Sequence, residues 1–141
     1  FDDVEARTAM EEADAEDWAE AWKKENINRA IGELLAKGGI VARATGRMEF
    51  GARALGNRSI LADPANPLVT NEINQKIKNR DFWMPFAPVV MRERAGDYLA
   101  NPKGLASPYM MLAFDANERH EEFIAAIHPA DRTARPQILS S

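Results

Sequence analysis

The stretch "GGIVARATGRMEFGARALGNRSILADP", residues 38–64, contains a helix stop, two strand-like segments and a glycine-rich centre that separates them. Its first two glycines end a helical pattern that covers residues 15–37. "IVARATG" (40–46) and "RSILADP" (58–64) have the composition of short strands, and Pro64 ends the second. Because helix and strand signals follow one another so closely, the stretch predicts a domain that mixes both.

The other periodic segments agree with a mixed domain. We expect helices at 2–13, 67–80 and 93–100, and strands at 86–91, 108–114 and 133–139. The pattern at 121–127 fits either a helix or a strand, and Pro136 places the last strand at an edge or a bulge. These elements predict a single α/β domain, or α+β, with one twisted mixed sheet and flanking helices.

The same patterns predict the environment of some side chains. In the helix at 67–80, the expected N-cap is Thr70 or Asn71, and the expected inward-facing residues are Leu68, Ile73 and Ile77. Near the strand at 86–91, the residues expected to be mostly buried are Trp83, Phe86 and Met110.

The composition of the 141 residues fits one soluble globular domain, with 45% hydrophobic and 28% charged residues. No apolar run is long enough to span a membrane, and the acidic first residues do not resemble a signal peptide. The chain has no cysteine, which excludes disulfides and thiolate chemistry and fits a cytoplasmic protein.

The net charge of −4 conceals an uneven distribution of charged residues. Nine of the 22 acids and one of the 18 bases lie in residues 1–20, which leaves thirteen acids and seventeen bases in residues 21–141. The body of the domain is therefore mildly basic, behind an acidic helical leader at 1–37. This balance suits a compact anionic ligand better than a long polyanion such as nucleic acid.

The glycine-rich centre of the opening stretch concentrates polar side chains. They are those of Arg47, Glu49, Arg53, Asn57, Arg58 and Ser59. One interpretation is a surface loop whose arginines pair with Glu49 or Asp63, which contributes little to stability. The other is a phosphate site, in which glycines expose backbone N–H groups and guanidinium groups grip oxyanions.

Three further groups of polar residues are candidates for ligand contacts. The first is the cationic set Lys76, Lys78 and Arg80, which also complements the dipole at a helix end. The second is Ser107, although a serine before proline commonly makes a turn. The third is "HPADRTARPQ" (128–137), with His128, Asp131, Arg132, Thr133, Arg135 and Gln137. The sequence has no phosphate-loop or zinc signature, and no nucleophile elbow surrounds Ser107.

Taken together, "GRMEFGARALGNRSILADP", "KIKNRDFWMPFAPVV", "SPYMM" and "HPADRTARPQ" resemble the C-terminal domain of the nodulation- and cephamycin-type O-carbamoyltransferases. The resemblance spans about residues 38–139 and implies a YrdC-like α/β fold. The family usually has proline in place of Ala52, commonly arginine in place of Met84, and often glycine in place of Arg132. Because the family continues past the position of residue 141, the resemblance implies that 38–141 is a domain truncated at its C-terminus.

The resemblance also implies a reaction. The substrates would be carbamoyl phosphate and ATP with Mg²⁺, and the product a carbamoyl-adenylate. An N-terminal actin-like domain would then transfer the carbamoyl group to an acceptor hydroxyl, and its metal is not expected in this chain. Residues assigned to substrate or nucleotide binding are Arg47, Glu49, Arg53, Asn57, Arg58, Ser59, Lys76, Lys78, Arg80, Ser107, His128, Asp131, Thr133 and Arg135.

Two other functions stay open on the sequence. The mildly basic body permits an RNA- or nucleotide-binding module without catalysis, although the aromatic residues that would stack on bases are not interleaved with the cations. A fragment that only docks to its partner domain would bind no ligand at all.

Overall fold

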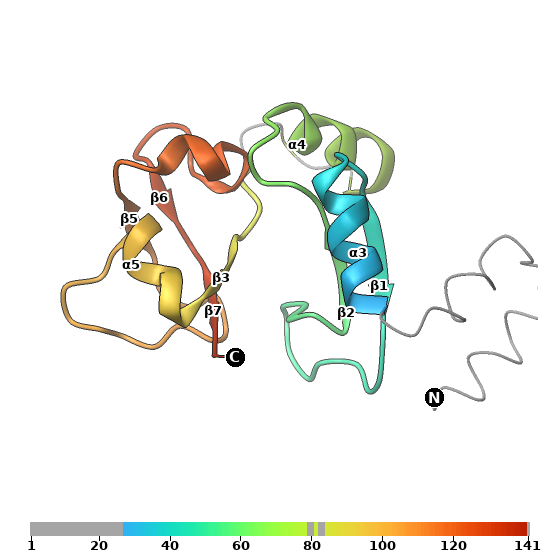
Figure 1. Cartoon of the computed structure of the whole chain (residues 1–141), viewed down its shortest axis with the longest axis horizontal. Coiled ribbons are helices and arrows are strands. Elements are labelled where there is room, and N and C mark those ends of the chain that lie inside the picture. Colours follow the sequence, from blue (N-terminus) through green and yellow to red (C-terminus); the bar gives the residue numbers. More distant parts are fainter. Residues whose placement is uncertain (1–26, 79–80, 82–83, 141) are drawn as a thin grey trace, which may run out of the picture. The chain divides into compact units, whose positions relative to one another are not determined.

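The computed structural model describes residues 27–78, 81 and 84–140, which Figure 1 shows in colour. They form two compact units with a boundary between Ala62 and Asp63. The helix expected at 2–13, the first part of the next helix, Arg80 and Trp83 all lie outside the described residues.

The described part of the first unit is a helix followed by a β-hairpin. Its elements are α3 (Ile27–Ala36), β1 (Val41–Ala44) and β2 (Arg58–Leu61). The two strands are antiparallel, with Val41 opposite Leu61 and Ala44 opposite Arg58. The expected strands at 40–46 and 58–64 are therefore confirmed in shorter form, and residues 45–57 become the loop that joins them.

The end of α3 confirms the role of the glycine pair. Gly38 has a φ of 81°, and its N–H donates to the carbonyl of Leu35 at 2.9 Å. The N–H of Gly39 donates to the carbonyl of Leu34, also at 2.9 Å. These bonds form a Schellman cap, which needs a residue that tolerates positive φ. A Cβ at Gly39 would lie 2.9 Å from the Leu34 carbonyl oxygen, so both positions favour glycine.

The second unit combines short helices with short strands. In chain order these are α4 (Leu68–Ile73) with a π-helical turn (Asn74–Lys78), β3 (Val89–Met91), a 3₁₀ turn (Arg92–Arg94), α5 (Ala95–Tyr98), β4 (Leu99–Ala100), β5 (Phe114–Ala116), a 3₁₀ segment (His120–Ala126), β6 (Thr133–Ala134) and β7 (Gln137–Leu139). The ambiguous pattern at 121–127 is thus helical, with a break at Phe123, where φ is −142°.

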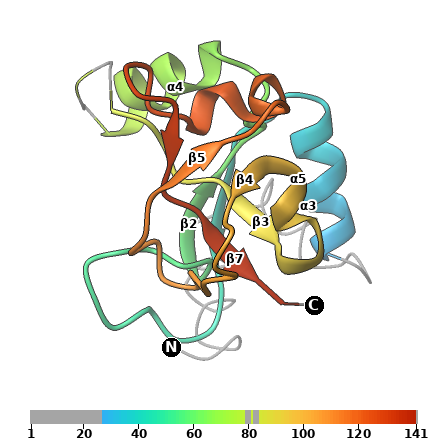
Figure 2. The same ribbon diagram turned by 90° about the vertical axis from the view of Figure 1, so that its left-hand side faces the viewer.

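The fold class is confirmed as mixed α/β, but the expectation of one mixed sheet is wrong. The described residues contain three small sheets: β1–β2, the antiparallel β4–β5–β6 and the parallel pair β3–β7. Figure 2 shows β3 and β7 side by side. The expected strand at 133–139 is divided by Pro136, which has no N–H for a ladder, so β6 and β7 pair with different strands.

The expected strand at 108–114 is also wrong, because only Phe114 belongs to a strand. Met110 has a φ of 55°, which breaks an extended conformation. Just before this segment, the backbone carbonyl of Ser107 accepts the N–H of Ile138 at 2.8 Å. The apolar residues that follow Ser107 are largely at the surface, with Tyr109 and Met111 both exposed.

Two further side-chain expectations need correction. In the strand at 86–91, only Val89–Met91 are paired, and Phe86 and Met110 are half-buried rather than mostly buried. Because helix α4 begins at Leu68, neither Thr70 nor Asn71 caps it. The inward face of the helix is formed by Val69 and Ile73, whereas Leu68 and Ile77 are exposed. The side-chain oxygen of Asn66 accepts the N–H of Leu68 at 3.0 Å and so takes the capping role.

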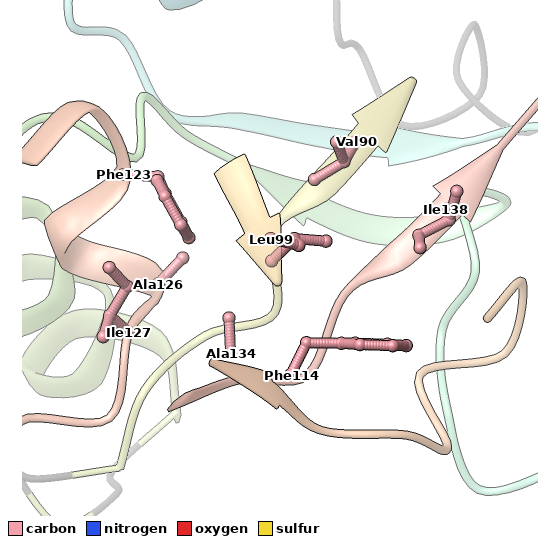
Figure 3. Close-up of a cluster of buried hydrophobic side chains, with 8 residues drawn as sticks. All are labelled: Val90, Leu99, Phe114, Phe123, Ala126, Ile127, Ala134 and Ile138. Atoms are coloured by element: carbon pink, nitrogen blue, oxygen red, sulfur yellow. The ribbon is translucent and has the colours of Figure 1, made fainter. Parts of the chain in front are cut away.

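The hydrophobic core described in the second unit gathers residues from strands β3 to β7 and from the 3₁₀ segment (Figure 3). Its members are Val90, Leu99, Phe114, Phe123, Ala126, Ile127, Ala134 and Ile138. The ring of Tyr98 packs edge-on against Phe123 with 5.7 Å between centroids. The Arg119 guanidinium lies 4.8 Å from the centre of the Tyr98 ring and makes a cation–π contact with it. No described helix is long and apolar enough to cross a membrane.

Asn74 in the second unit is polar and only 4% exposed, and neither of its side-chain amide atoms forms a hydrogen bond with a residue that the structure describes. An unsatisfied buried amide costs about 1–3 kcal/mol, so Asn74→Leu should raise the free energy of unfolding by an amount in this range. Urea unfolding of the two proteins measures the difference. A less stable Asn74→Leu variant would show that the amide makes a stabilising contact.

Candidate functional site

The loop at 45–57 is organised by the carboxylate of Glu49. One oxygen, Oε1, accepts the backbone N–H groups of Leu55 at 2.7 Å, Asn57 at 2.6 Å and Arg58 at 3.4 Å. The three donors follow Glu49 by six to nine residues, so the carboxylate closes the second half of the loop on itself. Glu49 therefore serves as a common acceptor for backbone N–H groups of the loop.

Arg58 supplies the complementary donors. Its Nη1 donates to the carbonyls of Thr45 and Asn57, both at 2.9 Å, and its Nη2 donates to the carbonyl of Gly46 at 3.1 Å. The guanidinium group thus ties the two ends of the loop together where β1 ends and β2 begins. Three of the hydrogen bonds of this guanidinium group are therefore made to backbone carbonyls of the protein.

Asn57 and Ser59 complete this framework. The side-chain amide of Asn57 donates to the carbonyl of Arg47 at 2.8 Å, and the Ser59 hydroxyl accepts the N–H of Gly56 at 3.0 Å. Gly56 has a φ of 122°, a backbone conformation that a residue with a Cβ adopts only with strain. Glycine is needed here for the path of the chain.

Arg47 and Arg53 are different from the other polar residues of the loop. Both side chains are exposed, and neither forms an ion pair with a residue that the structure describes. The surface-loop interpretation expected such pairs with Glu49 or Asp63. Glu49 instead accepts backbone N–H groups, and Asp63 accepts the N–H of Ala65 at 2.9 Å. Two exposed guanidinium groups therefore lie on a loop whose backbone is hydrogen-bonded by other side chains.

The environment of Glu49 also changes its acidity. Partial burial raises the pKa of this carboxyl, but backbone N–H groups, its own and those of Leu55, Asn57 and Arg58, together outweigh burial and lower the pKa to about 2. The carboxylate therefore stays charged, and keeps its hydrogen bonds, far below neutral pH.

This shift predicts a pH dependence of stability. A carboxyl with a lowered folded-state pKa adds stability above its ordinary pKa of 4.5, and this contribution is lost as the pH falls toward about 2. Wild type should exceed Glu49→Gln in free energy of unfolding at neutral pH, and the difference should shrink below pH 4.5. Urea unfolding of both proteins across this range measures it. A stability difference between the two proteins that did not change with pH would contradict the lowered pKa of Glu49.

The candidates in the second unit have partners of their own. Lys76 pairs with Glu72 at 2.7 Å, one helical turn away, while Arg80 and the side chain of Lys78 lie outside the described residues. The Ser107 side chain is 2% exposed, and its hydroxyl donates to the carbonyl of Pro136 at 3.1 Å. In this structure Ser107 holds the chain beside β7, and its role in ligand binding stays a prediction.

The turn between His128 and Thr133 brings three of the predicted side chains together. Asp131 Oδ1 accepts the backbone N–H and the hydroxyl of Thr133, both at 2.9 Å, and lies 3.3 Å from Nδ1 of His128. These bonds to Thr133, with the nearby His128, lower the pKa of Asp131. Arg135 is exposed beyond the turn. The arrangement is a hydrogen-bonded turn whose contacts with a ligand stay a prediction.

A cavity of about 180 Å³ in the second unit was not anticipated from the sequence. Its lining residues are Pro67, Thr70, Asn71, Met84, Pro85, Ile124, Ala125, Ile127 and Pro129. The Thr70 hydroxyl donates to the carbonyl of Ala125 at 3.3 Å across this region. The lining comes from segments more than fifty residues apart, so no local motif could reveal it.

A family model described as carbamoyltransferase C-terminus matches residues 32–141. The chain belongs to this carbamoyltransferase family. The match begins inside α3 and includes both the loop at 45–57 and the turn at 128–133, so each candidate cluster lies within the carbamoyltransferase domain. Arg132, in the turn at 128–133, has a φ of 57°, a backbone conformation that favours glycine.

The chain is also similar to several curated proteins. The chain is 36% identical to nodulation protein NolO of Bradyrhizobium diazoefficiens over 119 residues, 84% of this chain and 22% of the relative. It is 34% identical to nodulation protein U of Sinorhizobium fredii over 110 residues, 78% of this chain and 19% of the relative. An uncharacterized protein of Methanocaldococcus jannaschii is 39% identical over 117 residues, 83% of this chain and 22% of the relative. The chain therefore spans about a fifth of the length of the relatives it matches.

Proposed function

We propose that this domain binds ATP–Mg²⁺ and carbamoyl phosphate and forms a carbamoyl-adenylate. The observation that carries the proposal is the loop at 45–57, whose backbone is held by its own side chains while those of Arg47 and Arg53 are exposed. A triphosphate beside a second phosphorylated substrate requires fixed cations to offset the mutual repulsion. Family membership supplies the carbamoyl chemistry.

Mg²⁺ enters this reaction with the triphosphate. Within residues 27–78, 81 and 84–140 no group of three or more His, Cys, Asp or Glu side chains lies close enough together to hold a metal. Magnesium in nucleotide sites is commonly held by phosphates and water with one or two carboxylates, so a larger protein cage is not required.

The final transfer step is assigned to another part of the polypeptide. Because the chain matches only about a fifth of each relative, the relatives have room for a separate N-terminal domain. We infer that this actin-like domain passes the carbamoyl group from the adenylate to an acceptor hydroxyl. The use of ATP and carbamoyl phosphate also supports a cytoplasmic location.

Calorimetric titration and an assay of pyrophosphate release test the proposal. Water first cleaves carbamoyl phosphate to carbamate and inorganic phosphate. A carbamate oxygen then attacks the α-phosphate of ATP and displaces pyrophosphate, so pyrophosphate release reports adenylate formation. We expect the 141-residue chain to bind ATP–Mg²⁺ weakly, and the full-length protein to release pyrophosphate when carbamoyl phosphate is added. Absence of ATP binding by both proteins would overturn the proposal. An affinity for RNA that falls steeply with salt and is unaffected by ATP would favour a nucleic-acid-binding module instead.

A further inference from the structure

The carboxylate of Glu49 is the common acceptor for the second half of the arginine-bearing loop. Three backbone N–H groups, from Leu55, Asn57 and Arg58, converge on a single oxygen at 2.6–3.4 Å. A set of N–H groups directed at one oxygen is an anion-binding arrangement, and here the anion is part of the chain. The Glu49 carboxylate therefore occupies the position that a ligand oxygen would take between these N–H groups.

The two exposed arginines are attached directly to this arrangement. Arg53 lies inside the segment that the bond between Glu49 and Leu55 closes. Arg47 precedes Glu49 by two residues, and its carbonyl is held by the amide of Asn57, whose own N–H donates to Glu49. The path of the backbone at both arginines thus depends on the same carboxylate.

We propose that Glu49 is a positioning residue, which fixes the loop backbone and thereby directs Arg47 and Arg53 toward a phosphate group. This inference rests on the proposed function for the identity of the ligand, but not for the order of the loop. It differs from the sequence-based expectation that Glu49 itself contacts substrate. Glu49 acts on the anion only through the two arginines.

The proposal predicts a change in phosphate affinity that is opposite in sign to the change expected from charge repulsion alone. A negative charge near a phosphate site repels the ligand, so a variant that removes only this charge should bind phosphate more tightly. If Glu49 positions the arginines, neutralising it should weaken binding, because the gain in Coulomb energy is outweighed by the loss of a fixed geometry. The direction of the change in affinity therefore separates the two roles.

Two variants of Glu49 and one control are suited to the test. Glu49→Gln keeps the length of the side chain and removes its charge, whereas Glu49→Asp keeps the charge and shortens the reach by one methylene. Glu33→Gln removes the same charge from an exposed site on α3, where Glu33 pairs with Arg29 at 2.9 Å. All three are compared with the unmodified 141-residue chain under conditions where each is folded.

Hydrogen–deuterium exchange and calorimetry supply independent measurements. Exchange at the amides of Leu55 and Asn57 reports whether the loop is held, without any ligand. Titration with inorganic pyrophosphate and with ATP–Mg²⁺ reports the affinity. We expect both Glu49 variants to exchange faster at these amides and to bind both ligands on the order of tenfold more weakly, since charge-assisted hydrogen bonds are lost. Glu33→Gln should match the unmodified chain in both measurements.

Several results would overturn the inference. Unchanged exchange in Glu49→Gln would show that the carboxylate does not hold the loop, and equal or tighter anion binding would show that it does not position the arginines. If the unmodified chain bound neither pyrophosphate nor ATP, the proposed function would fail. Faster exchange in both Glu49 variants would then still support the fixing of the loop by Glu49, and unchanged exchange would reject it.

Discussion

Phe123→Ala is expected to lower the free energy of unfolding of the second unit by about 3–5 kcal/mol, through lost burial and the cavity left behind. Phe123 is 4% exposed, packs among the residues of the buried cluster and meets the ring of Tyr98 edge-on. Urea unfolding followed by tryptophan fluorescence and circular dichroism measures the loss.

Phe50→Ala is the matched control for this prediction. The Phe50 side chain is fully exposed in the loop at 45–57, so the same chemical change should alter stability by no more than about 0.5 kcal/mol. Phe86 is half-buried and outside the cluster. Phe86→Ala should therefore lower the free energy of unfolding by an amount between those of Phe50→Ala and Phe123→Ala. If Phe86→Ala cost as much as Phe123→Ala, the position of the core would be wrong.

Replacing both exposed arginines of the loop should nearly abolish binding of ATP–Mg²⁺. Each charge-assisted contact is worth about 1.5–3 kcal/mol, so Arg47→Ala and Arg53→Ala should each weaken binding roughly ten- to a hundredfold. The losses should add where the two side chains grip different oxygens. Arg53→Lys should have an affinity between those of the unmodified chain and Arg53→Ala, because lysine keeps the positive charge but lacks the planar guanidinium group. Calorimetric titration measures all of these affinities.

Arg29→Ala controls for the change in net charge. Arg29 lies on α3 in the same unit, and its side chain is highly exposed beside Glu33. We expect it to leave the affinity for ATP nearly unchanged. Arg58→Ala should also weaken binding, but by loosening the loop, since its donors hold the carbonyls of Thr45, Gly46 and Asn57. Equal losses in Arg29→Ala and Arg53→Ala would indicate a general charge effect and reject a specific phosphate site.

The local elements of the first unit could be predicted from the sequence. The glycine pair after residue 37 ends α3 because only glycine readily adopts the required positive φ. The strands before and after the glycine-rich centre form where their apolar residues indicated. The family could be predicted as well, since its motifs are continuous stretches of sequence and the family match begins at residue 32.

The roles of the loop residues could not be assigned in the same way. Arg47, Arg53 and Arg58 are chemically identical in sequence, but only Arg58 is turned onto backbone carbonyls up to thirteen residues away. Glu49 offered one usable signal, because a lone carboxylate in a glycine-rich loop is an acceptor for the loop's own N–H groups. Which N–H groups it meets depends on how the hairpin brings residues 49 and 55–58 together.

Periodicity determined which segments were apolar, but only tertiary structure decided their pairing and burial. The apolar run at 108–114 has the composition of a strand, yet the buried Ser107 anchors it beside β7 and leaves Tyr109 and Met111 at the surface. Phe86 and Phe123 have equal hydrophobicity, and only the second meets enough neighbours to be buried. Local preference sets the backbone conformation of each segment within a few residues, whereas pairing and burial depend on contacts between segments far apart in sequence.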